Sequence, residues 1–557
     1  MNIDYQGRVF DYAAPASPAG RHPVAVVGAG PVGLATAIDL AQNGVPVVLL
    51  DDDNKLSHGS RAICFSKRTL EIFDRLGCGE RIASKGVRWH VGRVFNRGEE
   101  VYSFDLLPET GHERPAFVNL QQYYVEGYLH ERAQELPQLD LRWCSKVTGL
   151  AQHADHVVLT VATPDGEYAL EAAYVVAADG GKSGVRGLMG LESIGRTFRD
   201  RFLIADVKMA ADFPAERRFW FDPPFHPGQS VLLHRQPDNI WRIDFQLGWD
   251  ADPVAEKAPE RVIPRIQALL GKDAAFTLEW VSVYTFCCLR MASFRHGRVL
   301  FAGDAAHGVS PFGARGANSG VQDADNLAWK LRLVLDGAAP DALLDTYASE
   351  REGAADENIL HSTRATDFIT PKSAVSKLFR DAVLQLAKEQ PFARKLVNSG
   401  RLSTPATYVD SALNTPDSER FGGCMRLGAP AADAPLALDG APAWLLRQAG
   451  NGFTGIYFAG SAREAGELAA KTLPVRALVI APKGQGGPAI FEDSEGLFAD
   501  RYDARPGSFY LLRPDQHLCA RWRGVDARAV RAALARASGS ASTQAVDSGA
   551  APRMEHA

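Results

Sequence analysis

Three glycine-rich turns, each directly after a predicted apolar strand, contain the residues whose types could do chemistry. The longest turn follows the strand RVLFAG: Asp304 comes next, and a loop with Pro311 and several glycines leads into an amphipathic helix. A carboxylate beside free backbone amides can accept hydrogen bonds from hydroxyl groups and donate others to an anion. The amides at the start of the helix, near Asn318, would supply those donors. The sequence therefore predicts a site for a ligand with both hydroxyl and anionic groups.

The first turn has the spacing of a dinucleotide-binding fold. Gly28, Gly30 and Gly33 form a GxGxxG between the apolar strand VAVV and a helix that begins at Pro31. Gly28 permits the tight turn, Gly30 lets the backbone approach a pyrophosphate, and Gly33 lets helix and strand pack closely. Asp51 lies 23 residues after Gly28, at the end of the strand VVLL, where an acid accepts hydrogen bonds from ribose hydroxyls. This combination favours dinucleotide binding over a purely structural glycine turn.

The second turn ends the strand VVAA with Asp179 and Gly180, and Ser183 and Arg186 follow. Taken alone, it is also typical of an ordinary turn with a capped helix. The turn at Asp304 has a similar simple interpretation, a strand–loop–helix connection. A flavin nucleotide, however, needs a carboxylate for its ribityl hydroxyls and donors near the ring edge that becomes anionic on reduction. The turn at Asp304 offers both, so it favours a flavin among the dinucleotides.

The composition excludes several other classes of protein. The chain has 557 residues, of which 46% are hydrophobic and 23% charged, and its net charge of −5 argues against nucleic acid or an anionic membrane as the main partner. Its seven cysteines form no CxxC pair or spaced metal set, so we expect neither a metal site nor thiol redox chemistry. We find no apolar signal core at the N-terminus and no run of about 18 apolar residues. The expected location is therefore the cytoplasm.

Changes in residue composition and pattern along the chain predict its domains. Four strand-like stretches rich in aromatic and β-branched residues lie at about 195–290, with the turn QPDN between two of them, and predict an inserted antiparallel sheet. A Pro/Ala/Gly-rich stretch near 429–443 suggests a linker before a small α/β domain. The expected organisation is an N-terminal extension (1–20), a nucleotide-binding domain with the inserted sheet (21–400), a linker (401–443), a third domain (444–537) and a disordered tail (538–557).

Together the three turns resemble those of the flavin-dependent aromatic hydroxylases, the group A monooxygenases of the p-hydroxybenzoate hydroxylase fold. The resemblance covers about residues 22–380, and SRAICFSKRTLEIFDRLG and QQYYVEGYL look like further family segments. It implies an α/β fold: a Rossmann-like FAD-binding domain, an antiparallel substrate sheet and a C-terminal thioredoxin-like domain. The implied FAD contacts are Gly28, Gly30, Gly33, Asp51, Arg61, Gln122, Asp179, Gly180, Arg186, Gly303, Asp304, Gly316, Ala317 and Asn318.

The resemblance is strongest to the 3-(3-hydroxyphenyl)propionate and phenol hydroxylase-like members. Their C-terminal domain has no redox cysteines, and here Cys424 and Cys519 form no pair, which favours a structural or oligomerisation role for it. One departure is Ala314-Arg315, where relatives often have glycine. A homodimer is expected by analogy.

The resemblance also implies the reaction. In this family NADH or NADPH reduces FAD, the reduced flavin and O2 form a C4a-hydroperoxide, and its distal oxygen attacks a phenolic ring. The protein positions and shields this chemistry, so water must be excluded. We expect Pro311 in the loop under the flavin ring, and His234, Arg235 and Tyr284 as candidates for the substrate site.

Each candidate has a simpler interpretation. His234 and Arg235 would lie on an exposed hairpin, Tyr284 would fill the core, and His307 would serve structure rather than catalysis. Other residues are expected to be surface charges or packing residues: Arg217, Arg218 and His226 as charges, Cys287 and Cys288 as packing. Three other functions stay open: a flavin reductase or dehydrogenase on the same scaffold, a monooxygenase of a larger polycyclic or antibiotic substrate, and a non-catalytic dinucleotide-binding protein.

Overall fold

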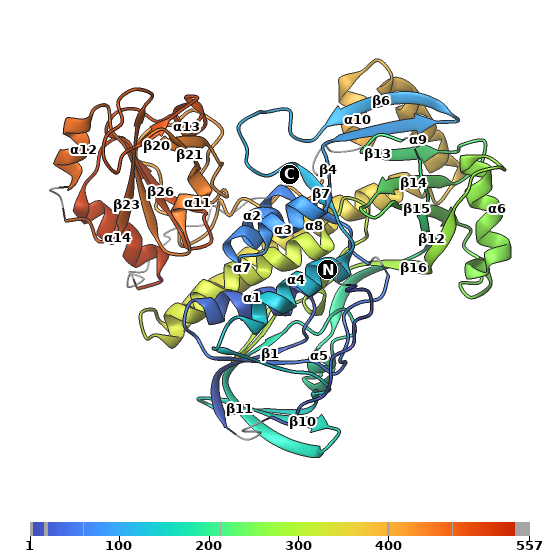
Figure 1. Cartoon of the computed structure of the whole chain (residues 1–557), viewed down its shortest axis with the longest axis horizontal. Coiled ribbons are helices and arrows are strands. Elements are labelled where there is room, and N and C mark those ends of the chain that lie inside the picture. Colours follow the sequence, from blue (N-terminus) through green and yellow to red (C-terminus); the bar gives the residue numbers. More distant parts are fainter. Residues whose placement is uncertain are drawn as a thin grey trace, which may run out of the picture.

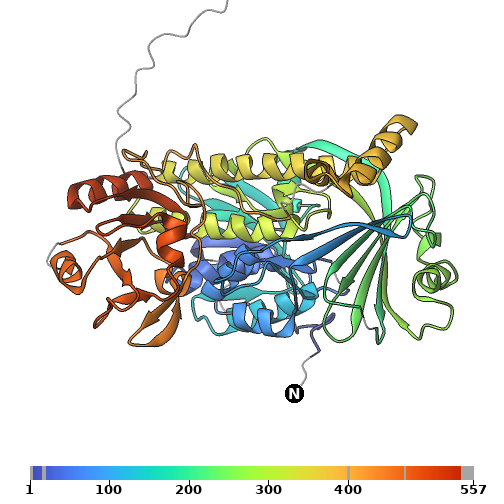
Figure 2. The ribbon, with the colours of Figure 1, turned by 90° about the horizontal axis from the view of Figure 1, so that it is seen from above.

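A computed structural model describes residues 4–15, 20–59, 61–211, 213–397, 402–469 and 472–540. The chain forms a central domain, a large sheet to one side of it and a C-terminal domain to the other (Figure 1 and Figure 2). None of the described helices is both long and apolar enough to cross a membrane. The predicted disordered tail lies outside the described residues from 541 onward.

The central domain is built on parallel strands in the order β18-β11-β1-β2-β8. Its strands are β1 (Arg21–Val27), β2 (Val47–Leu50), β8 (Leu139–Arg142), β11 (Gly166–Ala177) and β18 (Val299–Phe301). Strand β1 is central, and its Val24–Val27 segment is buried. The covering helices include α1 (Pro31–Gln42), α4 (Gln122–Gln134) and α7 (Gly316–Leu335). This arrangement confirms the predicted Rossmann-like fold.

The N-terminal segment and a small sheet complete the central domain. Tyr5 is buried against α4, where its hydroxyl donates to Glu131 Oε1 at 2.6 Å. The small sheet pairs β3 (Cys64–Ser66) and β4 (Val87–Trp89) with β7 (Phe117–Asn119). Helix α2 (Lys67–Arg75) follows β3 and packs on α7. It faces the C-terminal domain in Figure 1.

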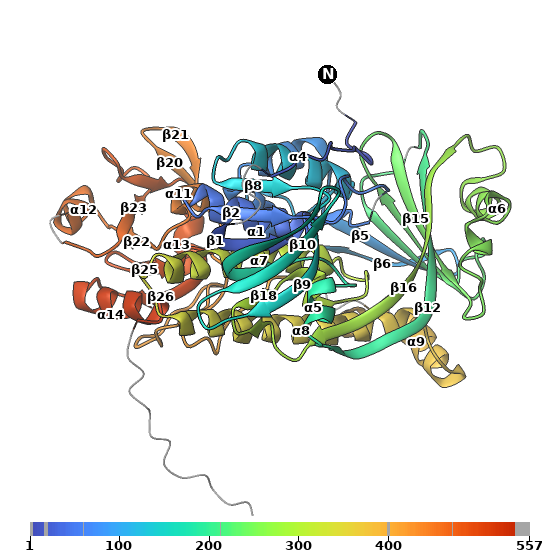
Figure 3. The same ribbon diagram turned by 90° about the horizontal axis from the view of Figure 1, so that it is seen from below.

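The large sheet has the order β19-β16-β12-β15-β14-β13-β5-β6. Figure 3 labels its strands β5, β6, β12, β15 and β16. Its bounds are β5 (Val91–Asn96), β6 (Glu99–Asp105), β12 (Ser193–Lys208), β13 (Arg217–Phe221), β14 (Ser230–Arg235), β15 (Ile240–Leu247), β16 (Thr277–Met291) and β19 (His307–Gly308). The predicted hairpin turn Gln236–Asn239 joins β14 to β15, and Asp238 and Asn239 adopt positive φ in it. The sheet is larger than predicted, because β5 and β6 join it from outside 195–290 and β5 pairs with β13 in parallel.

The two faces of the large sheet have different neighbours. On one face, Leu203, Trp241 and Phe245 pack under helix α6 (Pro259–Leu270). On the other face, Phe202 and Phe286 meet a cluster to which three helices contribute, α8 (Asp345–Ile369), α9 (Ala374–Ala387) and α10 (Pro391–Val397). This second face is the one directed at the central domain.

The C-terminal domain has a seven-stranded sheet in the order β21-β20-β24-β23-β22-β25-β26. Its elements are β20 (Pro435–Leu438), β21 (Ala441–Trp444), α11 (Leu445–Ala449), β22 (Thr454–Phe458), α12 (Ala462–Ala469), β23 (Arg476–Pro482), β24 (Phe491–Asp493), α13 (Leu497–Tyr502), β25 (Phe509–Leu512), β26 (Leu518–Trp522) and α14 (Ala527–Ala537). Strands β22 and β23 are parallel across α12, and β25 and β26 form a hairpin before α14. These β-α-β and β-β-α halves agree with the thioredoxin-like architecture expected from the resemblance.

The segment predicted as a linker contributes to this domain. Strands β20 and β21 pair with each other, β20 pairs with β24, and Leu436 lies in the domain core. The linker prediction rested partly on the prolines of this segment, but they occupy positions at which a sheet tolerates proline. Pro435 begins its strand and Pro442 lies on the edge strand β21.

Candidate active site

The three glycine-rich turns lie side by side because they follow neighbouring parallel strands. Val27 of β1 is in register with Ala177 of β11, and Ala177 is in register with Phe301 of β18. The carboxyl ends of these strands therefore share one edge of the sheet, at the point where the strand order changes direction, which is the usual ligand site of such sheets. The Arg186 guanidinium joins the second turn to the third by donating to Ala305 O at 2.8 Å.

The first turn is closely packed except at one position. Gly28 has φ +102°, and a Cβ there would lie 2.5 Å from Ala178 O of the second turn. A Cβ on Gly33 would lie 1.8 Å from Gly28 O, so only glycine fits. A Cβ on Gly30 would meet no described atom within 4 Å. Close packing at two glycines and open space at the third agree with the roles predicted for them.

Asp51 is oriented by two backbone amides. Its Oδ2 accepts from Ala29 N at 2.5 Å and its Oδ1 from Asp53 N at 2.9 Å. Burial raises the pKa of Asp51 to about 6, although both amides oppose the shift. Its carboxylate thus lies directly beside the first glycine turn, where ribose hydroxyls were expected.

The second turn leaves one buried acceptor unused. Asp179 Oδ2 accepts from Val185 N at 3.0 Å, and the Ser183 hydroxyl caps helix α5 (Gly184–Leu188) by accepting from Arg186 N at 3.0 Å. Asp179 Oδ1 is buried and has no hydrogen-bond partner among the described residues. A buried carboxylate oxygen without a donor is costly, so this atom is suited to a hydroxyl or amide of a ligand.

The third turn presents a carboxylate that the rest of the chain does not use. Gly303 has φ +61°, and a Cβ there would lie 2.9 Å from Val32 Cγ2. The Asp304 side chain is exposed, and no described residue donates a hydrogen bond to it or forms an ion pair with it. Nevertheless, the protein around this side chain raises its pKa, chiefly by desolvation. Asp304 is therefore ready to accept from the hydroxyls of a bound ligand.

Asp323 on α7 holds the third turn, and we did not single it out in the sequence. This fully buried carboxylate accepts from Gly303 N at 2.9 Å, from His307 Nε2 at 2.7 Å and from Arg351 Nε at 2.6 Å. Burial alone would raise the pKa of Asp323, but His307 and Arg351 outweigh it and lower the pKa. The sequence did carry a signal, because an acid at 323 shares the apolar helix face of Leu327 and Leu331.

His307 has a supporting position. Because a carboxylate only accepts, the Nε2 of this buried ring must carry the proton and donate to Asp323. The ring also stacks on Phe294 at a centroid distance of 5.6 Å. These contacts agree with the structural role that was expected for His307.

The loop after the third turn connects the central domain to the large sheet. Pro311 is exposed, whereas the next residue, Phe312, packs edge-on against Phe202 at 5.0 Å and Phe286 at 5.3 Å. Ala314 has φ +54°, a left-handed conformation that is easier for glycine, and Arg315 Nη1 donates to Phe312 O at 2.9 Å. This departure from the family pattern thus keeps a glycine-like backbone with an alanine.

Helix α7 begins directly after this loop. The backbone amides of Gly316, Ala317 and Asn318 lie in its first turn, where no carbonyl of the same helix accepts hydrogen bonds from them. The Asn318 side chain is already used, since its Nδ2 donates to Cys64 O at 2.8 Å and its Oδ1 accepts from Ser66 N at 2.9 Å. The backbone of this segment, rather than the Asn318 side chain, is therefore available to a ligand.

The segment that carries Arg61 connects Gln122 of the central domain to the large sheet. Gln122 Oε1 accepts from Ala62 N at 3.0 Å, which fixes the segment that carries Arg61. The Arg61 side chain is exposed, and its carbonyl accepts from Arg242 Nη1 of β15 at 3.1 Å. Gln122 therefore acts first on the backbone, and the Arg61 guanidinium stays accessible.

Polar side chains gather on the face of the large sheet that is directed at the central domain. His234 is 4% exposed, is the cross-strand neighbour of Arg242, and has its Nδ1 4.0 Å from Cys64 Sγ. Burial, Arg217 and Arg242 together lower the pKa of His234 well below its usual value, so its ring is neutral. Burial likewise raises the pKa of Asp244 to about 6.

Arg217 is the main correction to the sequence analysis in this region. We expected a surface charge, but its side chain is 9% exposed and none of the described residues forms a hydrogen bond or ion pair with it. Arg218, the next residue on β13, points to the opposite face, where it lies 5.0 Å from the Phe213 ring and pairs with Glu216 at 2.8 Å. His226 is also buried, with Nε2 2.8 Å from Gln246 O.

The three substrate-site candidates separate into two groups. Tyr284 shares the polar face, 6.4 Å from the Trp280 ring, and Trp280 is the cross-strand neighbour of Asp206. Burial raises the pKa of Tyr284. Arg235 does not join this group, because strand neighbours alternate and its guanidinium lies over Trp241 on the α6 side. The expectation that His234 lies on an exposed hairpin is wrong.

Comparison with known proteins identifies the family. Residues 21–362, more than half of the chain, match the model of the FAD binding domain family, so the chain belongs to that family. A 3-(3-hydroxy-phenyl)propionate/3-hydroxycinnamic acid hydroxylase of Mycolicibacterium smegmatis is 29% identical over 398 residues, 70% of this chain and 69% of the relative. A 6-methylpretetramide 4-monooxygenase of Streptomyces rimosus is 30% identical over 525 residues, 89% of this chain and 90% of the relative.

A solved structure supports the fold over nearly the whole chain. The flavin-dependent monooxygenase PieE, determined in complex with FAD and substrate, superposes with a TM-score of 0.77 over 95% of this chain and 100% of its own, at 22% identity. The comparisons confirm the resemblance to flavin-dependent aromatic hydroxylases and FAD as the cofactor. The residues fit that cofactor, because the unused oxygens of Asp179 and Asp304 and the open space at Gly30 offer what its hydroxyls and phosphates require.

Proposed function

We propose that this chain hydroxylates a phenolic aromatic substrate with NADH or NADPH and O2. The observation that carries the proposal is the contact of Phe312, from the loop after Asp304, with Phe202 and Phe286 of the large sheet. This contact sets the expected FAD position against a sheet face that combines aromatic rings with buried polar groups. Such a face suits a flat ring with hydroxyl substituents.

The chain's own residues would bind and shield the reactants. FAD, when bound and reduced by NADH or NADPH, supplies the oxygen-activating chemistry. Asp304 accepts hydrogen bonds from the ribityl hydroxyls, and the amides of Gly316 to Asn318 stabilise negative charge at the ring edge. Phe202, Phe286 and Phe312 keep water out.

The polar side chains on the face of the large sheet that is directed at the central domain would activate the substrate. The neutral His234 ring can accept a hydrogen bond from a phenolic hydroxyl, and the nearby Arg217 guanidinium favours the ionised, phenolate form of that hydroxyl. A phenolate ring is richer in electrons and more easily attacked by an electrophilic oxygen. Tyr284, on the same face, is positioned to contact the ring.

A screen of hydroxylated aromatic compounds tests this function. We expect at least one to accelerate NADH or NADPH oxidation by the holoenzyme about tenfold or more, which is about 1.4 kcal/mol of barrier. The product should be heavier than the substrate by one oxygen atom, as measured by mass spectrometry. Accelerated oxidation with an unchanged aromatic compound would instead support a reductase or dehydrogenase and contradict the proposal.

The substrate position is tested by two neighbouring arginines. Arg217→Met should weaken substrate binding about 10- to 100-fold, because a charge-assisted hydrogen bond contributes about 1.5–3 kcal/mol. Arg218→Met removes the same charge from the opposite face of the same strand and should leave substrate binding within about twofold, because the Arg218 guanidinium lies over Phe213, away from the proposed substrate. The measurement is substrate Kd from the perturbation of the flavin absorption spectrum. Equal effects of the two variants would contradict the assigned face.

A further inference from the structure

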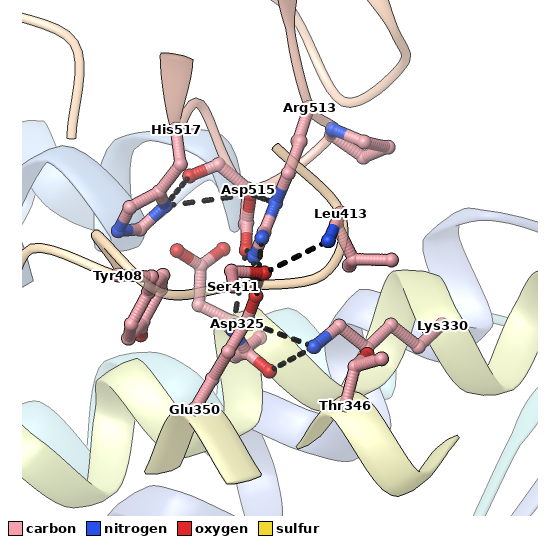
Figure 4. Close-up of polar contacts among 12 residues, drawn as sticks. Asp325, Lys330, Thr346, Glu350, Tyr408, Ser411, Leu413, Arg513, Asp515 and His517 are labelled. Atoms are coloured by element: carbon pink, nitrogen blue, oxygen red, sulfur yellow. Dashed lines mark hydrogen bonds and ion pairs between the residues drawn. The ribbon is translucent and has the colours of Figure 1, made fainter. Parts of the chain in front are cut away.

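The loop between β25 and β26 of the C-terminal domain is buried against the central domain. Arg513 donates to Glu350 of α8 through Nη1 at 2.6 Å and Nη2 at 3.0 Å, and it also pairs with Asp515 in the middle of the loop. The loop backbone accepts from helix α2, with Arg75 Nη1 3.1 Å from Pro514 O and Arg68 Nη2 2.6 Å from Asp515 O. Figure 4 shows Arg513 and Asp515 above Glu350.

Glu350 accepts hydrogen bonds from residues of both domains. Besides Arg513, it accepts from Lys330 Nζ at 2.8 Å and from Ser411 Oγ at 2.5 Å (Figure 4). It also accepts from Asn326 Nδ2 at 2.7 Å. Burial would raise the pKa of Glu350, but Arg513 and Lys330 outweigh it and hold the pKa far below its usual value. Breaking one partner of such a buried pair costs about 3–5 kcal/mol. The position of α8 is thus fixed by the C-terminal domain.

Arg351, the next residue of α8, links this contact to the turn that carries Asp304. Arg351 donates to Tyr408 OH through Nη1 at 2.8 Å, and the Tyr408 ring stacks on His517 of the same C-terminal loop at 4.7 Å. On its other side, Arg351 Nε donates to Asp323, which accepts from Gly303 N and from His307. An unbroken set of contacts therefore runs from His517 to the turn that carries Asp304.

We propose that the C-terminal domain is a positioning element of the FAD site. Its loop 513–517 fixes Arg351 through Tyr408 and Glu350, and Arg351 fixes Asp323 against Gly303 and His307. The backbone of Gly303, and with it the direction of the Asp304 carboxylate, depends on this support. The proposal concerns FAD binding alone, so its failure would leave the proposed hydroxylation untouched.

Tyr408→Phe tests the proposal, with Tyr502→Phe as its matched control. Both tyrosines are buried, and each loses one hydroxyl hydrogen bond: Tyr408 to Arg351 at 2.8 Å, and Tyr502 to Ala432 O at 2.7 Å inside the C-terminal domain. Each loss should lower the free energy of unfolding by about 1 kcal/mol. Tyr408→Phe keeps the ring that stacks on His517, so both full-length variants are expected to fold.

Only Tyr408→Phe should alter the flavin site. We expect its FAD Kd, measured by quenching of protein fluorescence on titration of the apoprotein, to rise about three- to tenfold, and the visible spectrum of its bound flavin to differ from wild type. Tyr502→Phe should keep the wild-type Kd and spectrum while its melting temperature falls by a similar amount. The proposal is overturned if the FAD Kd of Tyr408→Phe does not exceed that of Tyr502→Phe, because the contacts would then contribute only stability.

Discussion

Asp304→Ala is expected to purify without yellow colour, whereas the wild-type protein retains FAD. The Asp304 carboxylate has no partner among the described residues, so its hydrogen-bonding capacity is left for the ribityl hydroxyls. Losing one or two charge-assisted hydrogen bonds of about 1.5–3 kcal/mol each should raise the FAD Kd at least about 10- to 100-fold. The measurement is FAD content after purification, followed by FAD titration of the apoprotein.

The same substitution should not destabilise the apoprotein. The pKa of Asp304 is raised in the folded state, so its ionised form opposes folding above the unfolded pKa of about 3.9 and has no effect well below it. Removing the carboxylate should therefore leave the melting temperature of the apoprotein at pH 7 equal or slightly higher. Asp336→Ala, which removes an exposed acid at the other end of α7, should keep FAD. Full FAD retention by Asp304→Ala would contradict its role.

Asp323→Asn is expected to lose both stability and FAD affinity. Asparagine leaves the buried Arg351 guanidinium without its carboxylate, which costs about 3–5 kcal/mol, and it cannot satisfy Gly303, His307 and Arg351 together. The displaced Gly303 backbone would move Asp304, so the FAD Kd should rise about tenfold or more. The measurements are chemical denaturation of the apoprotein and FAD titration.

Asp74→Asn is the matched control for this second variant. Asp74 is a buried carboxylate that accepts from Arg114 Nε at 2.7 Å and Nη2 at 2.6 Å, away from the glycine turns. Asp74→Asn should therefore lose stability but keep the wild-type FAD Kd. Loss of FAD affinity in both variants to the same extent would show that the effect of Asp323→Asn follows from instability alone.

The pH dependence of the free energy of unfolding separates the contribution of Asp323 to stability from other effects. Because its folded pKa is lowered, Asp323 stabilises the protein above its unfolded pKa of about 3.9, and this contribution is lost as the pH falls through the folded value. The difference in free energy of unfolding between wild type and Asp323→Asn should be constant from about pH 5 to 8 and narrow only below about pH 4. A difference that changes near neutral pH would be contrary to this assignment.

The sequence predicted the glycine turns well because their constraints are local. The positive φ of Gly28 and the contact of Gly33 with Gly28 O both arise within one strand–turn–helix unit, and parallel strands with helical crossovers then bring their carboxyl ends to one edge. The support of those turns was missed because it is not local. Arg351 lies far from Gly303 in the sequence, and nothing near it indicates that it holds Asp323.

The large sheet shows two limits of pattern-based prediction. Strand alternation says that Arg217 and Arg218 face opposite sides, but the burial of Arg217 depends on which side meets the central domain. Similarly, β5 and β13 pair in parallel although about 120 residues separate them, and neither strand encodes its partner. The sequence therefore suggested candidate site residues on the sheet, but it could not predict which of them face the central domain.

Oxygen-isotope labelling tests the central claim most directly. The holoenzyme would be incubated with NADH or NADPH, an aromatic compound that accelerates its oxidation, and heavy-isotope O2 in ordinary water. We predict a hydroxylated product whose new oxygen atom comes from O2. A product whose new oxygen comes from water, or an aromatic compound recovered unchanged while the reduced nicotinamide is consumed, would contradict the assignment of this chain as a monooxygenase.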